Sequence, residues 1–154
     1  MDRRMFLGGM LMAGGSGLLR GSRVFGAAAG WSAYSSIAIA AGAERCAIIG
    51  QDGTFWACSH SDKTKQNYTM AVRDVKQLIK DTLAKVSSGE MHFDGSKFTY
   101  TTIMQDALIG KKAEYACAVQ ATAKTIVVVI VRESPKRAFE CLTPTVSALQ
   151  KVGM

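Results

Sequence analysis

The feature that most limits the fold of this chain is the run Thr125–Val131, which reads TIVVVIV. β-Branched side chains favour strands, and a strand with one face in water alternates apolar and polar residues. This run has no such alternation. It therefore predicts a strand that is covered on both faces, so packed elements are needed on each side of it.

The flanking segments predict further strands and tight connections. Strands are expected at 46–50, 54–59, from 91 onward, and at 97–103, 108–112 and 115–122. The Asp-Gly pairs at 52–53 and 94–95 lie between apolar runs, which is typical of hairpin turns. Neighbouring strands joined by short turns indicate one meandering antiparallel sheet.

Three helices are expected around that sheet, at 31–41, 69–86 and from Ser134 to about 152. Thr69 is a plausible N-cap of the middle helix, and Ser134 followed by Pro135 suits the start of the last one. We expect Pro144 to kink or split the last helix. The prediction is an α+β fold, with the N- and C-terminal helices on one face of the sheet and the middle helix on the other. One helical face of the middle segment collects its apolar residues: Met70, Val72, Val75, Leu78, Ile79, Leu83 and Val86.

Residues 1–30 differ from the rest of the chain, because their only acid is Asp2 and they carry four arginines among many Gly, Ala, Met and Leu residues. The glycines disfavour a stable helix, so we expect a flexible segment outside one domain at 31–154. Residues 3–7 (RRMFL) resemble a twin-arginine export signal. The Arg-rich, acid-poor composition also suits a mitochondrial presequence, and an extension without a targeting role is the third interpretation.

Charge and cysteine usage narrow the partners and the compartment. The formal charge is +7, which favours acidic partners, but residues 31–154 contain no dense Lys/Arg run that would demand nucleic acid. The cysteines lack CxxC spacing, so buried thiols in a reducing compartment are favoured over a disulfide pair, which needs an oxidising location. The four are Cys46, Cys58, Cys117 and Cys141.

Signs of catalysis or metal binding are weak. The chain lacks nucleotide-binding loops, nucleophile elbows and zinc-protease motifs, so no enzyme is predicted. Cys58 and His60 make at most half of a metal site, and His92 is the only other histidine. We therefore expect no metal and no cofactor.

The aromatic residues give the clearest indication of a binding site. Trp31 and Tyr34 are three residues apart on one face of the first predicted helix, and Trp56 lies in the hairpin that follows. Exposed rings with polar tips form grooves for polyproline II segments: proline rings stack on the indoles, and N–H and O–H groups bond the ligand's carbonyls. The alternative is that the three rings only fill a helix–sheet core.

Six segments, in order along the chain, resemble the profilin family over residues 31–154. They are 31–34 (WSAY), 45–50 (RCAIIG), 52–57 (DGTFWA), 108–112 (LIGKK), 122–133 (TAKTIVVVIVRE) and 149–154 (LQKVGM). The resemblance implies a small, non-catalytic, cytoplasmic and cytoskeleton-associated protein. Its implied partners are monomeric actin, proline-rich proteins such as formins and, weakly, phosphoinositide lipids, and not nucleic acid.

The resemblance also implies two sets of site residues. The poly-proline site comprises Trp31, Tyr34, Trp56, Leu149 and Met154. The actin-binding set comprises Lys97, Thr99, Lys111, Lys112, Lys136, Arg137 and Glu140. Ala148 stands where the family usually has Tyr or His, and Met154 where many members end in Tyr, so weaker proline binding is expected.

Two alternatives to this interpretation stay open at this point. The lysines of the actin-binding set are, in the simpler interpretation, solvated side chains without a partner. The chain as a whole is, in the second, an exported or organellar small α/β interaction domain of longin-like layout, with no actin role and no proline groove.

Overall fold

The computed structural model describes residues 29–62, 70–132 and 134–154. These ranges hold three helices and seven strands: α1 (Ala29–Ala40), β1 (Arg45–Gly50), β2 (Phe55–His60), α2 (Val72–Ala84), β3 (Glu90–Phe93), β4 (Ser96–Met104), β5 (Ala107–Lys112), β6 (Tyr115–Ala121), β7 (Thr125–Val131) and α3 (Pro135–Lys151). The expected targeting or extension segment lies outside the described residues, except for Ala29 and Gly30, which begin α1. The expected N-cap Thr69 also lies outside the described residues. No helix in the described ranges is long and apolar enough to span a membrane.

The strands form one antiparallel sheet in the order β2-β1-β7-β6-β5-β4-β3. Strand β7 lies between β1 and β6, and all seven of its residues are buried. The α+β prediction is confirmed, including the central place of the TIVVVIV strand. The pairing of β1 with β7 joins the first and last strands of the chain, with Arg45 opposite Ile130 and Gly50 opposite Thr125.

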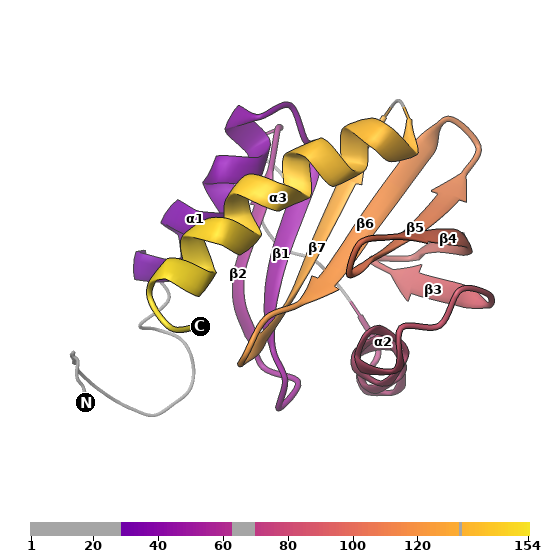
Figure 1. Cartoon of the computed structure of the whole chain (residues 1–154), viewed down its shortest axis with the longest axis horizontal. Helices are drawn as coiled ribbons and strands as arrows, with labels where there is room; N and C mark the ends of the chain where they lie inside the picture. Colours follow the sequence, from indigo (N-terminus) through magenta and orange to yellow (C-terminus); the bar gives the residue numbers. More distant parts are fainter. Residues whose placement is uncertain (1–28, 63–69, 133) are drawn as a thin grey trace.

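Two cores lie on the two faces of this sheet, because the side chains of β7 alternate between them. Figure 1 shows α1 and α3 together over one face and α2 on the other side. Ile126, Val128 and Ile130 join the core under α2, whereas Val127, Val129 and Val131 join the core under α1 and α3. The three-layer arrangement of the sequence prediction is therefore confirmed.

Helices α1 and α3 run antiparallel and are joined by side-chain hydrogen bonds. The Thr145 hydroxyl donates to the Tyr34 carbonyl oxygen at 3.2 Å. Near the other end, the Arg137 guanidinium donates to the Ala41 carbonyl oxygen at 2.7 Å. This bond satisfies a carbonyl that the end of α1 leaves without a helical partner. The positive charge of Arg137 is also favourable there, because the C-terminal end of a helix carries partial negative charge.

The sheet curls around the α2-side core, and one ion pair links strands that are far apart in the sheet. Arg45 Nη1 of β1 lies 2.8 Å from Asp94 Oδ2 in the turn between β3 and β4. Four strands separate β1 from β3 in the sheet order, so the curl alone brings these residues together. Asp94 and Gly95 both have positive φ, as the predicted two-residue hairpin turn requires.

Helix α2 departs from the prediction in length and in the face it buries. It begins at Val72, and the preceding Ala71 makes no side-chain capping bond. Its buried residues are Val75, Leu78 and Thr82, whereas Val72 and Leu83 are 70% and 51% exposed. The apolar face that the helical period marks is therefore wider than the strip of the helix that the sheet covers, and Val72 and Leu83 lie outside that strip.

Helix α3 begins as predicted but is not split. The Ser134 side chain accepts a hydrogen bond from the Arg137 backbone N–H, and Pro135 occupies the first turn. The helix continues through Pro144 to Lys151 as one element. Both Pro144 and Glu140, whose carbonyl loses its helical donor, are exposed. Water can hydrogen-bond to the Glu140 carbonyl, so the helix continues through Pro144 without a break.

Candidate functional site

Three aromatic rings meet where α1 crosses β2. The ring centroids of Trp31 and Trp56 are 4.8 Å apart with planes tilted by 40°. Trp31 and Tyr34 are 5.7 Å apart with a tilt of 37°. These separations are typical of favourable aromatic pairs. All three side chains are half-buried and pack on the core under α1 and α3, so each keeps part of its surface in solvent.

The backbone of β1 is shaped to accept the Trp56 ring. A Cβ placed on Gly50 would lie 2.7 Å from Trp56 Nε1 and 2.8 Å from Asp52 Oδ1. Heavy atoms rarely approach that closely without a hydrogen bond, so any side chain at Gly50 would displace the indole. Glycine at this position therefore lets Trp56 reach Trp31.

The C-terminus is tied to the same region. The Met154 backbone N–H donates to the Leu149 carbonyl oxygen at 3.0 Å, and the Lys124 N–H donates to the Met154 carbonyl oxygen at 2.9 Å. Met154 is half-buried against the core under α1 and α3. Leu149 is fully buried, so it supports the predicted site from beneath and offers no surface to a ligand. Ala148 is half-buried.

Part of the predicted actin-binding set shares one face of the sheet. Thr99 of β4 lies opposite Lys111 of β5. Lys97 is two residues before Thr99, which puts it on the same face of β4. All three are exposed, and Lys97 Nζ lies 3.4 Å from Glu90 Oε2. This face is the one that α1 and α3 cover elsewhere, because Ile109, two residues before Lys111, belongs to that core.

Lys112 lies apart from this group, since successive residues of a strand point to opposite faces. Its partner in β6 is Tyr115, which packs against the core under α2. Lys111 and Lys112, both members of the predicted actin-binding set, therefore face in opposite directions. A single patch containing both is not what the strand geometry provides.

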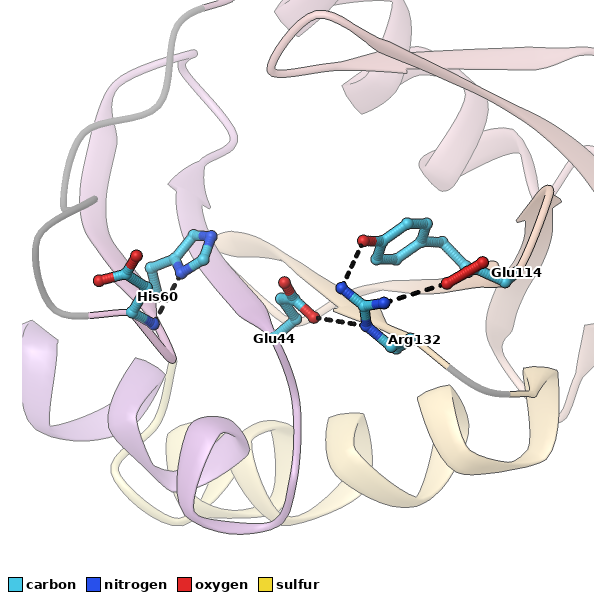
Figure 2. Close-up of polar contacts among 6 residues, drawn as sticks. Glu44, His60, Glu114 and Arg132 are labelled. Carbon is cyan, nitrogen blue, oxygen red and sulfur yellow. Dashed lines mark hydrogen bonds and ion pairs between the residues drawn. The ribbon is translucent and has the colours of Figure 1, made fainter.

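The sequence prediction missed a polar cluster at this end of the sheet (Figure 2). Arg132, just after β7, lies 3.0 Å from Glu114 Oε2 through Nη1 and 3.7 Å from Glu44 Oε1 through Nε. Its Nη2 also donates to the Tyr115 hydroxyl at 3.0 Å. The figure shows His60 at a separate place, where its Nδ1 accepts the Asp62 N–H at 2.9 Å. Arg132 holds the β5–β6 turn against the α1–β1 connection, and only the acids near it in three dimensions reveal this role.

The residues at the start of α3 divide between surface and structure. Lys136 is exposed. Arg137, besides its bond to Ala41, lies 3.6 Å from Glu140 Oε1, so both charges of that pair are partly neutralised. Among the predicted residues of this helix, Lys136 is therefore the one whose charge is most available to a partner.

Two of the thiols, those of Cys46 and Cys117, are poorly suited to nucleophilic chemistry. Burial raises the pKa of the Cys117 thiol to about 12, against a smaller lowering by a hydrogen bond with the Gly110 backbone. Burial also raises the pKa of Cys46, with further raising by Cys58 and Cys141. A thiol with a raised pKa holds little reactive thiolate at neutral pH. All four cysteines lie in the described ranges and none forms a disulfide, and no group of three metal-ligating side chains occurs there.

Comparison with known proteins relates this fold to one family. The family model described as Profilin matches residues 29–154. Acanthamoeba castellanii profilin II is 22% identical, with 80% of this chain and 99% of that chain covered and a TM-score of 0.62. No curated protein matches the sequence.

Two of the similar structures are complexes. LokiProfilin1 bound to rabbit actin is 14% identical, with 78% of this chain and 96% of that chain covered and a TM-score of 0.57. Mouse profilin IIa bound to a double repeat from the FH1 domain of mDia1 is 15% identical, with 82% and 100% covered and a TM-score of 0.57.

The layout of helices and sheet does not by itself decide the family. Myxococcus xanthus MglB, which does not bear the name profilin, is 11% identical, with 85% of this chain and 92% of that chain covered and a TM-score of 0.54. The family model decides, because it matches sequence along 29–154 and spans α1 to the C-terminus. The chain therefore belongs to the profilin family.

Proposed function

We propose that this protein binds monomeric actin and proline-rich segments of the kind found in formins, without catalysing a reaction, and that it acts in the cytoplasm on the actin cytoskeleton. The observation that carries the proposal is the half-exposed cluster of Trp31, Tyr34 and Trp56. A pure core role would bury these rings, but each keeps solvent-facing surface beside the terminal helices. The complex of mouse profilin IIa with an FH1 repeat supports the ligand class.

The ring cluster suits a polyproline II segment for a specific reason. Such a segment carries proline rings and unsatisfied carbonyl groups along its length, because it makes no internal hydrogen bonds. The indoles offer flat apolar surface, and the Trp N–H and Tyr O–H groups donate to carbonyls. Ala148 and Met154 contribute neither a ring nor a hydroxyl. The absence of a ring and a hydroxyl at these two positions is expected to weaken proline binding by up to about 2 kcal/mol if both positions are hot spots.

The actin site in this proposal is the face formed by Lys97, Thr99 and Lys111, extended by Lys136 at the start of α3. Actin is acidic, so a cationic face speeds association and fixes orientation. Arg137 and Glu140 belong to the edge of the site, where their mutual ion pair limits their contribution. The same exposed lysines would attract phosphoinositide headgroups weakly, at about 1 kcal/mol per lysine near an anionic surface.

Two binding sites on one small domain give an adaptor mechanism. A proline-rich elongation factor holds the protein through the aromatic cluster, while the lysine face holds an actin monomer. Tethering raises the effective concentration of monomer near a growing filament end to the millimolar range for a short linker.

The test of the proline site compares the parent chain with Trp31→Ala on an immobilised polyproline matrix. We expect loss of retention, because the substitution removes both ring contacts of Trp31. Tyr34→Phe keeps its ring and loses only the hydroxyl, so weakened but detectable retention is expected. Circular dichroism checks that each variant is folded. Equal retention of parent and folded Trp31→Ala would refute the proline site.

The test of the actin site uses the opposite orientation of the two neighbouring lysines. Lys111→Glu is expected to weaken binding of monomeric actin by roughly tenfold, because it reverses a charge on the proposed face. Lys112→Glu makes the same charge change on the other face and is the matched control. Both variants should be retained on polyproline as the parent is. Equal loss of actin binding in the two variants would argue against this face.

A further inference from the structure

Helix α2 carries a surface stripe that the fold does not use. Val72 and Leu83 are 70% and 51% exposed, and the half-buried Ile79 lies between them. Lys76 and Lys80 are exposed along the same side of the helix. Residues at spacings of four, seven, eight and eleven share one helical side, so these five side chains form one stripe, called here the α2 stripe.

A groove runs beside the α2 stripe. It lies between α2 and the hairpin that joins β1 to β2, and its volume is about 480 Å³. Phe55 lines it from the hairpin side, and Val75 and Ile79 line it from the helix. Grooves of a few hundred Å³ with mostly apolar walls take up apolar groups of a ligand. The groove and the exposed Val72 thus make a continuous apolar surface.

The rim of this groove is cationic. Lys76 and Lys80 both line it, and neither makes an ion pair with another described residue. The one acid among the described lining residues is Asp52, and its Oδ1 accepts the Thr54 N–H at 3.0 Å. The excess of positive charge at the rim therefore favours a ligand that carries acidic groups beside its apolar ones.

The length and charge of the stripe select one kind of occupant. From Val72 to Leu83 the helix rises by about 16 Å, or three turns, which is longer than a small molecule and matches a short helix. A second copy of α2 would bring the same lysines against Lys76 and Lys80. The first 28 residues of this chain carry four arginines, so repulsion from Lys76 and Lys80 disfavours them as the occupant as well.

We propose that the α2 stripe and its groove bind an acidic amphipathic helix of a partner protein. The partner's apolar side chains enter the groove, and its carboxylates pair with Lys76 and Lys80. This site is separate from the proposed actin and proline sites, because α2 covers the sheet face opposite to α1 and α3 (Figure 1). The domain would then hold a third partner while both other sites are occupied.

The test uses a fluorescein-labelled helical peptide of about five turns made of Leu, Ala and Glu, with Leu at helical spacing and Glu beside it. Anisotropy titration with the full chain should show saturable binding. Lys76→Glu with Lys80→Glu should weaken it at least about tenfold, and Val72→Ser with Leu83→Ser should weaken it similarly. Lys124→Glu with Lys151→Glu, at exposed lysines away from α2 and outside the proposed actin site, makes the same charge change as a control and should leave peptide binding unchanged.

Three outcomes would overturn the proposed peptide site. Absence of peptide binding by the parent, or equal binding of a peptide with Lys in place of every Glu, would overturn the proposal. Parent-like binding by both α2 variants would overturn it as well. The substituted residues are exposed, so thermal unfolding midpoints should stay near the parent's. Retention on polyproline should be unchanged in the α2 variants, which separates a failure of this proposal from a failure of the proline site.

Discussion

Gly50→Ala tests how closely the aromatic cluster depends on the backbone of β1. The added Cβ would lie 2.7 Å from Trp56 Nε1, 2.8 Å from Asp52 Oδ1 and 3.0 Å from Trp56 Cε2. Ordinary contacts between such atoms lie near 3.5–4 Å, so the indole must move by about 1 Å. Gly50 does not have positive φ, so alanine adds no backbone strain. The unfavourable effect is then steric: the added Cβ displaces the Trp56 indole and crowds the Asp52 carboxylate.

The expected magnitude follows from two opposing contributions. Replacing glycine by alanine at an unstrained position stabilises by about 0.4–1 kcal/mol through the unfolded state. Overpacking a closely filled site costs about 1–3 kcal/mol. The net expectation is a loss of roughly 1–2 kcal/mol in the free energy of unfolding. Opening the Trp31–Trp56 pair, worth about 0.5–1.5 kcal/mol, should also weaken polyproline binding.

Urea unfolding followed by tryptophan fluorescence measures the first effect, and a polyproline titration measures the second. Gly30→Ala is the matched control, because a Cβ at Gly30 meets no atom within 4 Å. That control should be as stable as the parent or more so. If Gly50→Ala is also at least as stable as the parent and binds polyproline equally, the reasoning about Trp56 is refuted.

Two further predictions concern the core under α2. Asp94→Asn, which keeps a residue that tolerates positive φ, should lower the free energy of unfolding by roughly 1–3 kcal/mol, because it removes the negative charge that lies 2.8 Å from the half-buried Arg45 and leaves only a neutral amide beside it. Unchanged urea midpoints would contradict this. Because folding raises the pKa of Cys117 from its ordinary 9.0 to about 12, its contribution to stability is complete below pH 9 and is lost as pH rises toward 12. Folded Cys117→Ala should show a flatter decline between pH 8 and 10.5 than the parent, and identical slopes would count against the buried thiol as a cause.

The sequence predicted the parts of the fold that depend on local patterns. An unbroken β-branched run identified β7, and Asp-Gly pairs identified two hairpins, because these signals act within a few residues. Periodicity did not predict which apolar residues of α2 would be covered. That outcome depends on how much of the helix the curled sheet reaches, and Val72 and Leu83 lie beyond it.

The sequence indicated site residues where the signal is local, and not where it depends on contacts between distant segments. The spacing of Trp31 and Tyr34 marked one helical face, but the approach of Trp56 depends on pairing between distant segments. Lys111 and Lys112 both belong to the predicted actin-binding set, but the alternation of side chains along a strand places them on opposite faces. The role of Arg132 is invisible in the sequence, because its partners Glu44 and Glu114 come from two other connections.

The pairing of β1 with β7 has a consequence for synthesis of the protein. The two strands are separated by roughly eighty residues, so β1 cannot find its inner neighbour until nearly all of the chain has left the ribosome. Until then one edge of the β1–β2 hairpin exposes unbonded backbone groups of an apolar strand, which favours association with other nascent chains. A product that stops before residue 125 should therefore aggregate, whereas completion of the last strand and helix removes that edge.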